Sequence, residues 1–396
     1  MSLTQSWTLD ASNSEVVSDL NQILLGLPGT AFVSAGDSAD AFKLQVTTNT
    51  QAVLDNIQLL TEFGSPLLQI TTASAFQASK YPDATFLAEL TVPSKRLQGF
   101  ECAGAGACVL DKGTQAVDQD LSLTASGAGT LFVSTQDIDA RFVSISNSGA
   151  GNVQWSASRV AAQSLTVSAS GTGSVSIAST VEIVPQSAQV QVQGAGSVFF
   201  AGSPFNVPTV TSTITGAGNI TYLPTAKCGV HTINVGGAGG IYAGSLTSQN
   251  TSVVVTGKGR VLAKVVDTLS TNGVGDVEFV GVTPANIQVT KSLWNRGPVL
   301  TSVNYYEPFR GFQVPAHDAT SIAAATPLPL ATPGSTSSPV VPVVSQGTRS
   351  TDDPSSGGSF NILMWFLGGL GVAIVVVVVL LRRHIANKHK EYTALK

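Results

Sequence analysis

The chain has 396 residues, of which 43% are hydrophobic and only 11% are charged, and its formal net charge is -4. This composition supplies enough apolar material for a core and excludes a chain that is disordered throughout. No basic stretch occurs before the last fifteen residues, which excludes a nucleic-acid-binding surface. The 39 glycines, together with abundant Ser, Thr and Val, favour an all-β fold of short strands joined by tight turns.

The first part of the chain, residues 1–83, shows no regular repeat. Its stretch SEVVSDLNQILLGLPG either opens a helix capped at Asn13 or holds a first strand from Ile23 to Leu27 that ends at Pro-Gly. We expect this part to be irregular, β-rich and placed as a cap, because the open strand edges at the end of a solenoid have to be covered.

Two glycines separated by one residue recur along residues 84–306. Counted along the sequence, the steps between successive first glycines are 23, 22, 22, 23, 22, 21, 20 and 16 residues. This nearly even spacing is typical of the coil period of a β-solenoid. The first glycines of the nine pairs are Gly104, Gly127, Gly149, Gly171, Gly194, Gly216, Gly237, Gly257 and Gly273.

Apolar side chains occupy two fixed places after each glycine pair, and mostly polar residues stand between them, which predicts a strand with one face inward. A second strand precedes the glycines, as at Leu121 and Leu123. Stacked at about 4.8 Å, equivalent residues would form continuous core columns, for example Val153, Val175, Val198 and Ile220. The sequence therefore predicts a parallel β-helix or β-solenoid with about nine coils of about 22 residues. Glycine suits the corners because it accepts a positive φ and lets stacked backbones approach closely.

These motifs resemble a known family. The phrase Leu90-Thr-Val-Pro93, then Leu97 and Gly104-Ala-Gly106, and the later units SGAGNV, SGTGSV and TGAGNI are similar to the head GIN domain of autotransporter adhesins, over about residues 84–282. The resemblance implies a β-helix-like fold on a secreted or membrane-attached protein with a role in adhesion. Members often carry Asp after the second glycine, whereas only Asp276 does so here, so we expect no function that depends on an Asp ladder.

The sequence of the C-terminal quarter of the chain predicts a membrane anchor. Residues 307–359 are rich in Pro, Ser and Thr and predict an extended stalk without a core. Residues 360–381 include twenty uncharged residues from Ile362, long enough to cross a bilayer as one transmembrane helix. The tail 382–396 is basic, which by the positive-inside rule places it in the cytosol and the N-terminal domain in an extracellular or lumenal space.

One feature conflicts with this orientation. The start MSLTQSWTLDASNSEVV lacks the basic and apolar regions of a signal peptide. Three alternatives stay open: the true start lies upstream, a leader has been dropped, or the large domain of a tail-anchored protein faces the cytosol. The outside orientation is favoured by the charge asymmetry, the stalk and two N-glycosylation sequons, at Asn219 and Asn250.

Candidate catalytic groups are few. Asp118 with Asp120, and Asp137 with Asp139, are spaced to point one way from a strand and lie about one coil apart, so they could cluster as acid/base carboxylates or hold a cation. A solvated acidic edge is the interpretation we favour, and we expect no enzyme, no metal and no cofactor. His231 is expected at the surface.

Cys102 and Cys108 either close a small disulfide loop, leaving Cys228 odd, or stay buried thiols. The tail ends with Tyr392 and Leu395 in a pattern similar to sorting signals read by clathrin adaptors. We therefore expect a single-pass, non-enzymatic surface protein in a lipid bilayer, whose partners are surface glycans or other surface proteins. The alternatives are a carbohydrate-active β-helix enzyme and a recycling receptor with a tyrosine-based tail.

Overall fold

The computed structural model describes residues 2–10, 17, 19–37, 41–61, 65–202, 204–223, 225–290, 299–301 and 311–322. Their secondary structure is almost wholly β, with one short helix, α2 (Gln51–Leu54), and one 3-10 turn, η2 (Ala78–Lys80). None of the helices in this part of the chain is long and apolar enough to cross a membrane. The predicted span 360–381 and the tail 382–396 lie outside the described residues.

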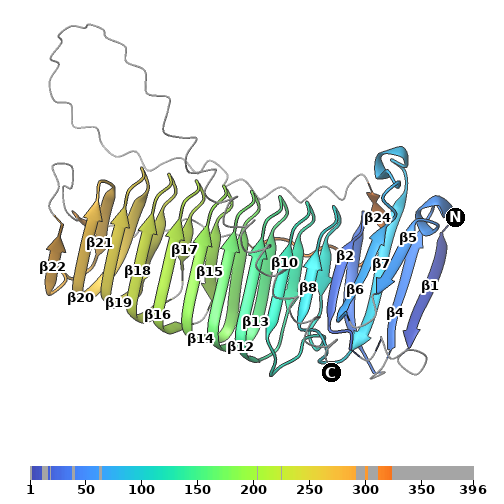
Figure 1. The fold of residues 1–396 in the computed structure, drawn as a ribbon, viewed down its shortest axis with the longest axis horizontal. Helices are drawn as coiled ribbons and strands as arrows, with labels where there is room; N and C mark the ends of the chain where they lie inside the picture. The colour runs from blue at the N-terminus through green and yellow to red at the C-terminus, as the bar shows by residue number, and fades with distance from the viewer. Residues whose placement is uncertain are drawn as a thin grey trace, which may run out of the picture. The chain divides into compact units, whose positions relative to one another are not determined.

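The predicted solenoid is present (Figure 1), and its coils have three sides rather than the two that were expected. Side A precedes each glycine pair, side B follows it, and side C leads back to side A. Side C was missed because its short strand runs on into side A without a turn residue: β12 holds Ile138–Ala140 on side C and Val143–Asn147 on side A. All three sides pair in parallel with the next coil.

The strands of the solenoid follow the chain from one end of the stack to the other, and the longer ones span two or three sides of a coil. Their bounds are β2 Gln22–Gly26, β3 Thr30–Gly36, β8 Gly99–Cys102, β9 Cys108–Leu110, β10 Leu121–Ala125, β11 Leu131–Ser134, β12 Ile138–Asn147, β13 Val153–Ala169, β14 Val175–Val192, β15 Val198–Gly202, β16 Phe205–Ile214, β17 Ile220–Tyr222, β18 Ala226–Val235, β19 Ile241–Val255, β20 Arg260–Gly273, β21 Asp276–Val280, β22 Asn286–Val289 and β23 Val299–Thr301.

The core columns confirm the predicted register. Val153 pairs with Val175, which pairs with Val198, which pairs with Ile220, and all four side chains are fully buried. Each column continues through the stack because the sequence repeats the same inward position once per coil, which buries an apolar face that one coil alone would expose.

The close approach of successive coils explains why glycine occupies their corners. A Cβ on Gly151 would collide with the carbonyl oxygen of Gly129 in the preceding coil, and the same holds for Gly237 above Gly216. The sequence also led us to expect a positive φ at these glycines. This expectation is wrong for eight of the nine first glycines, since among them only Gly273 has a positive φ. The stacked corners also bond to each other, as where the carbonyl of Gly149 accepts hydrogen bonds from the next coil.

The solenoid begins earlier than the expected boundary at residue 84. Strand β2 pairs in parallel with β8, and β3 pairs in parallel with β9, so residues 22–36 form the first coil. The phrase Leu27-Pro-Gly29 takes the place of the glycine pair there, since Gly104 and Gly106 stack on the backbone of Leu27 and Gly29. The predicted strand in this stretch is observed as β2, whereas most of the alternative helix capped at Asn13 lies outside the described residues.

An insertion between the first two coils covers the starting edge of the stack. Strand β6 pairs with β2, and β7 pairs with β3, so both exposed edges of the first coil are filled. Antiparallel pairings of β1 and β7 with β4, and of β5 with β6, complete this cap. The cap strands are β1 Leu3–Asp10, β4 Ala41–Thr48, β5 Ile57–Thr61, β6 Leu67–Thr72 and β7 Thr85–Pro93.

A return segment, residues 311–322, lies against the first coils and the cap. Phe312 packs on an outward-facing cluster of Phe32, Val109 and Phe132, and its amide donates to Oε1 of Gln154 at 2.7 Å. Further along, β24 (Thr320–Ser321) pairs with β7, beside which Figure 1 shows it.

The end of the return segment is fixed at the cap. His317 stacks on Phe32 with 4.1 Å between ring centroids, and its Nε2 lies 3.1 Å from Oε1 of Glu89. Ile322 is buried, and its amide donates to the carbonyl of Ala84 at 2.8 Å. Because β23 pairs with β21 on the last coil, the chain passes from the last coil to the cap before the predicted stalk. Residues 311–322, which were expected in the stalk, are therefore part of the folded domain.

We predict that Gly237→Ala destabilises the solenoid by at least about 2 kcal/mol, because its Cβ would meet backbone that cannot rotate away. Urea unfolding of the full chain measures this. Gly236→Ala is the matched control, since the nearest atom to its Cβ would be 3.7 Å away. Equal midpoints for the two variants would contradict the steric explanation.

We predict that Ile322→Asp lowers the free energy of unfolding by about 2 to 4 kcal/mol, because it places a charge in a buried apolar site at the cap. Val314→Asp, on the exposed part of the same segment at 48% exposure, should change it by less than about 0.5 kcal/mol. Thermal unfolding with limited proteolysis of the segment distinguishes the two. The packing of the return segment would be refuted by an Ile322→Asp variant as stable as the parent chain.

Candidate functional site

Charge is concentrated on one part of the solenoid. Seven charged residues occur between positions 118 and 182, and then none from 183 to 226. All seven lie on side C or at the corners at its two ends: Asp118, Asp120, Asp137, Asp139, Arg141, Arg159 and Glu182. In a chain with only 11% charged residues, this clustering marks side C of four successive coils as different from the Ser- and Thr-rich sides around it.

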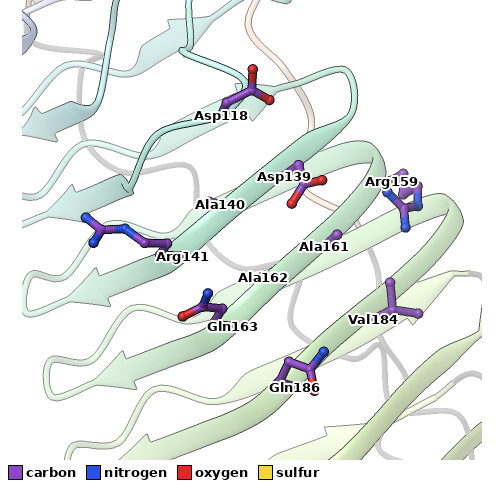
Figure 2. A pocket seen from close by; sticks show the side chains of 10 residues that line it. All are labelled: Asp118, Asp139, Ala140, Arg141, Arg159, Ala161, Ala162, Gln163, Val184 and Gln186. Atoms are coloured by element: carbon purple, nitrogen blue, oxygen red, sulfur yellow. The ribbon is translucent and has the colours of Figure 1, made fainter.

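An open groove of about 690 Å³ lies among these residues (Figure 2). We call it the polar groove. One wall is the row of Arg141, Gln163 and Gln186, which occupy equivalent positions on successive coils, and the other holds Asp118, Asp139 and Arg159. Its floor consists of small or short side chains, namely Ala140, Ala161, Ala162 and Val184.

The shape of the groove follows from strand alternation. Along side C, Ala140 and Ala162 point inward, while the residues on either side of each point outward. Where the outward row holds Ala161 in place of a long side chain, the surface is hollowed between Asp139 and the glutamines. The hollow is therefore a consequence of short residues at one place in the repeat.

Both arginines of the groove are held by ion pairs. Arg141 Nη2 lies 3.2 Å from Asp120 Oδ2, and the other carboxylate oxygen of Asp120 accepts from the amide of Phe142 at 3.0 Å. Arg159 Nε lies 2.8 Å from Glu182 Oε1, and this hydrogen bond raises the pKa of the Arg159 guanidinium above its usual value. The ion pairs fix the direction of the two arginines on opposite walls.

The structure brings Asp118 and Asp139 to the same groove, as their spacing predicted, whereas Asp120 turns to Arg141. Asp118, Asp137 and Asp139 are exposed. Within the described part of the chain, no group of three His, Cys, Asp or Glu residues could hold a metal ion. The two wall carboxylates are thus solvated groups placed to accept hydrogen bonds, which fits the solvated acidic edge that we favoured.

Several members of the groove were missed from the sequence: Arg159, Gln163, Gln186 and the alanine floor. A signal for them was present, because the charged residues cluster at intervals of about one coil and then stop. What sequence reasoning lacked was side C, the strand that brings the positions together.

The position after each second glycine forms a second feature that was missed. Oδ1 of Asn152 accepts from the amide of Ser174 at 2.8 Å, and Oγ of Ser174 accepts from the amide of Ser197 at 3.0 Å. Oγ of Ser197 accepts from the amide of Asn219 in turn, and Oδ1 of Asn219 accepts from the amide of Gly240 at 2.7 Å. We call this series of hydrogen bonds the relay. Short polar side chains at this place therefore join each coil to the next.

This relay bears on the two sequons. The amide group of Asn219 is partly buried in the relay, and Thr221 is fully buried. Asn250, by contrast, is exposed on β19, and so is Ser252. Glycosylation of either residue stays a prediction, and the geometry favours Asn250 as the acceptor.

The remaining predicted positions fall in different places. Cys102 and Cys108 form a disulfide across the first glycine pair, and Cys228 is a buried free thiol. Tyr392 and Leu395 lie outside the described residues, so the sorting signal stays a prediction.

The expectation that His231 lies at the surface is wrong. It points inward on side A of β18, with 1% of its surface exposed, in the column of Val210 and Thr251. Its Nε2 lies 2.9 Å from Oγ of Ser212, which is also 2.9 Å from the hydroxyl of Tyr222. Burial lowers the pKa of His231 to about 3, so the ring is neutral in the folded protein.

Part of this domain matches a known protein family. Residues 33–222 match the model of the family described as "Putative auto-transporter adhesin, head GIN domain". The resemblance to the head GIN domain family is confirmed. No curated protein matches the chain.

Solved structures of low sequence identity are also similar to this GIN-like chain. A "putative adhesin" of Parabacteroides merdae has 15% identity and a TM-score of 0.44, covering 73% of this chain and 96% of that one. One of Bacteroides fragilis has 16% identity and a TM-score of 0.32, covering 76% and 96%. A "putative lipid binding protein" of Parabacteroides distasonis has 14% identity and a TM-score of 0.38, covering 76% and 97%.

We predict that acid destabilises the fold through His231. Between about pH 6.5 and 3 the unfolded chain binds a proton at this residue that the folded protein does not, so the free energy of unfolding falls as the pH falls. The loss should reach about 2 to 3 kcal/mol between pH 7 and pH 4.5. Urea unfolding at both values should show a smaller loss for His231→Gln, whereas the control His384→Gln, in the basic tail, should behave like the parent chain. Identical pH dependence in all three proteins would refute this role.

Proposed function

We propose that the chain is a single-pass, membrane-anchored surface protein that acts in adhesion without catalysis. The observation that carries the proposal is the match of residues 33–222 to the head GIN domain family of adhesins. The apolar stretch from Ile362 to Leu381 and the basic tail after it support an anchor with the solenoid outside.

The surface of the solenoid supports a binding role. The outer row of side A is uncharged and polar through eight coils, so it offers repeated hydrogen-bonding groups at strand spacing, at which many weak contacts add up. The row comprises Ser122, Ser144, Thr166, Gln189, Thr211, Thr232, Ser252 and Ser270.

The return segment determines where the chain leaves the described part of the folded domain. Because Ile322 is fixed at Ala84, the chain that follows Ile322 begins beside the cap and not at the last coil.

We predict that protease added to intact cells removes the solenoid of a C-terminally tagged chain and leaves a short tagged fragment. The fragment survives because the tail is cytosolic and the span is embedded. Antibodies to the solenoid and to the tag report both parts on one blot. Opening the plasma membrane with detergent, which exposes the tag as well, is the control. A solenoid that is protected until the membrane is opened would overturn the surface orientation.

A further inference from the structure

We propose that the polar groove is a binding site for a linear, uncharged glycan that lies across successive coils. This inference rests on the proposed function and gives adhesion a site and a class of ligand. The starting point is that four of the seven charged residues between 118 and 182 line one groove and two more pair with its arginines, while the next forty-four residues carry no charge.

The hydrogen-bonding groups of the groove are available. Within the described part of the chain, the side chains of Asp118, Asp139, Gln163 and Gln186 make no hydrogen bond to the protein. A carboxylate accepts hydrogen bonds, and an amide both donates and accepts them, so neighbouring sugar hydroxyls would find partners of both kinds. The row Arg141, Gln163 and Gln186 repeats once per coil, about 4.8 Å apart, which provides donors along the length of a chain-like ligand.

An aromatic ring stands beside this row. Phe142 follows Arg141, is 53% exposed, and lies with its ring centroid 5.7 Å from the Arg141 guanidinium carbon. An exposed ring on a rim of polar side chains provides a flat apolar surface for the face of a sugar ring.

The balance of charge selects the ligand. The carboxylates of Asp118 and Asp139 and two guanidiniums line the groove, and both guanidiniums already bind a further carboxylate outside that lining. The remaining carboxylates give the groove a negative field, which disfavours sulfated, phosphorylated or sialylated chains. An uncharged glycan meets no such penalty.

A peptide fits less well. Side C of β13 is paired in parallel on both edges, and the outer edge of β12 there donates from the amide of Asp139 to the carbonyl of Val117, so the middle of the groove offers no free strand edge for an added strand. The floor of alanines provides no deep apolar site for an anchoring side chain. The proposal therefore commits to a glycan.

The test uses the purified full chain in detergent and a panel of linear glucan, mannan and chitin oligosaccharides, with heparin fragments and sialylated oligosaccharides as anionic probes. We expect binding of at least one uncharged oligosaccharide and none of the anionic probes. The double variant Gln163→Ala, Gln186→Ala should weaken binding by about tenfold. The matched control Gln193→Ala, at the exposed glycine corner that directly follows the strand of Gln186, should leave binding unchanged.

Three results would overturn the inference: no binding of any uncharged oligosaccharide, binding of the anionic probes alone, or equal binding by the double variant and the control. If the parent chain instead cleaved the oligosaccharides to shorter products, and the variant with both Asp118→Asn and Asp139→Asn did not, the protein would be identified as an enzyme. Unfolding midpoints equal to the parent's show that the variants are folded. Since this assay uses purified protein, its outcome is independent of the topology experiment, and either can fail alone.

Discussion

The glycine corners of successive coils approach each other too closely to admit a side chain. At eight of the nine second glycines, an added Cβ would collide with the carbonyl oxygen of the glycine one coil earlier, so a side chain has no room. The carbonyls of first glycines accept hydrogen bonds from the next corner, as Gly149 does from Thr172 and Gly173 at 3.1 and 3.2 Å. The corner therefore sets both the spacing and the register of the coils, and every column of the core depends on it.

Once the register is set, equivalent residues form rows. Inward rows build a continuous core in which even Trp155 is fully buried, with its Nε1 donating to Thr135 at 3.0 Å. The residues that directly follow each second glycine form another row, in which side chains such as Asn152 and Ser174 accept hydrogen bonds from backbone amides of the next coil. Outward rows differ from side to side, which allows one side to carry an uncharged polar face while another carries the polar groove.

The two ends of the stack differ in how far the chain covers them. The insertion between the first and second coils fills both edges of the first coil, and the return segment adds β24 to the same cap. At the other end, the described part of the last coil leaves Ile287 41% exposed, although its column is buried in earlier coils. Covering one end removes the strand edges that would otherwise recruit another chain.

The period of the glycine pairs and the apolar residues at fixed places after them determined the solenoid, its register and columns such as that of Val153, because these features repeat locally along the sequence. Tertiary structure alone decided the rest. His231 occupies an inward place that is apolar in most coils, so no local pattern marked it as buried. The first coil, with Leu27-Pro-Gly29 at its corner, and the return segment at Ala84 depend on contacts between residues far apart in sequence. Gln163 and Gln186 became neighbours of Asp139 only through side C, since pairing between coils, not distance along the chain, brings them to one groove.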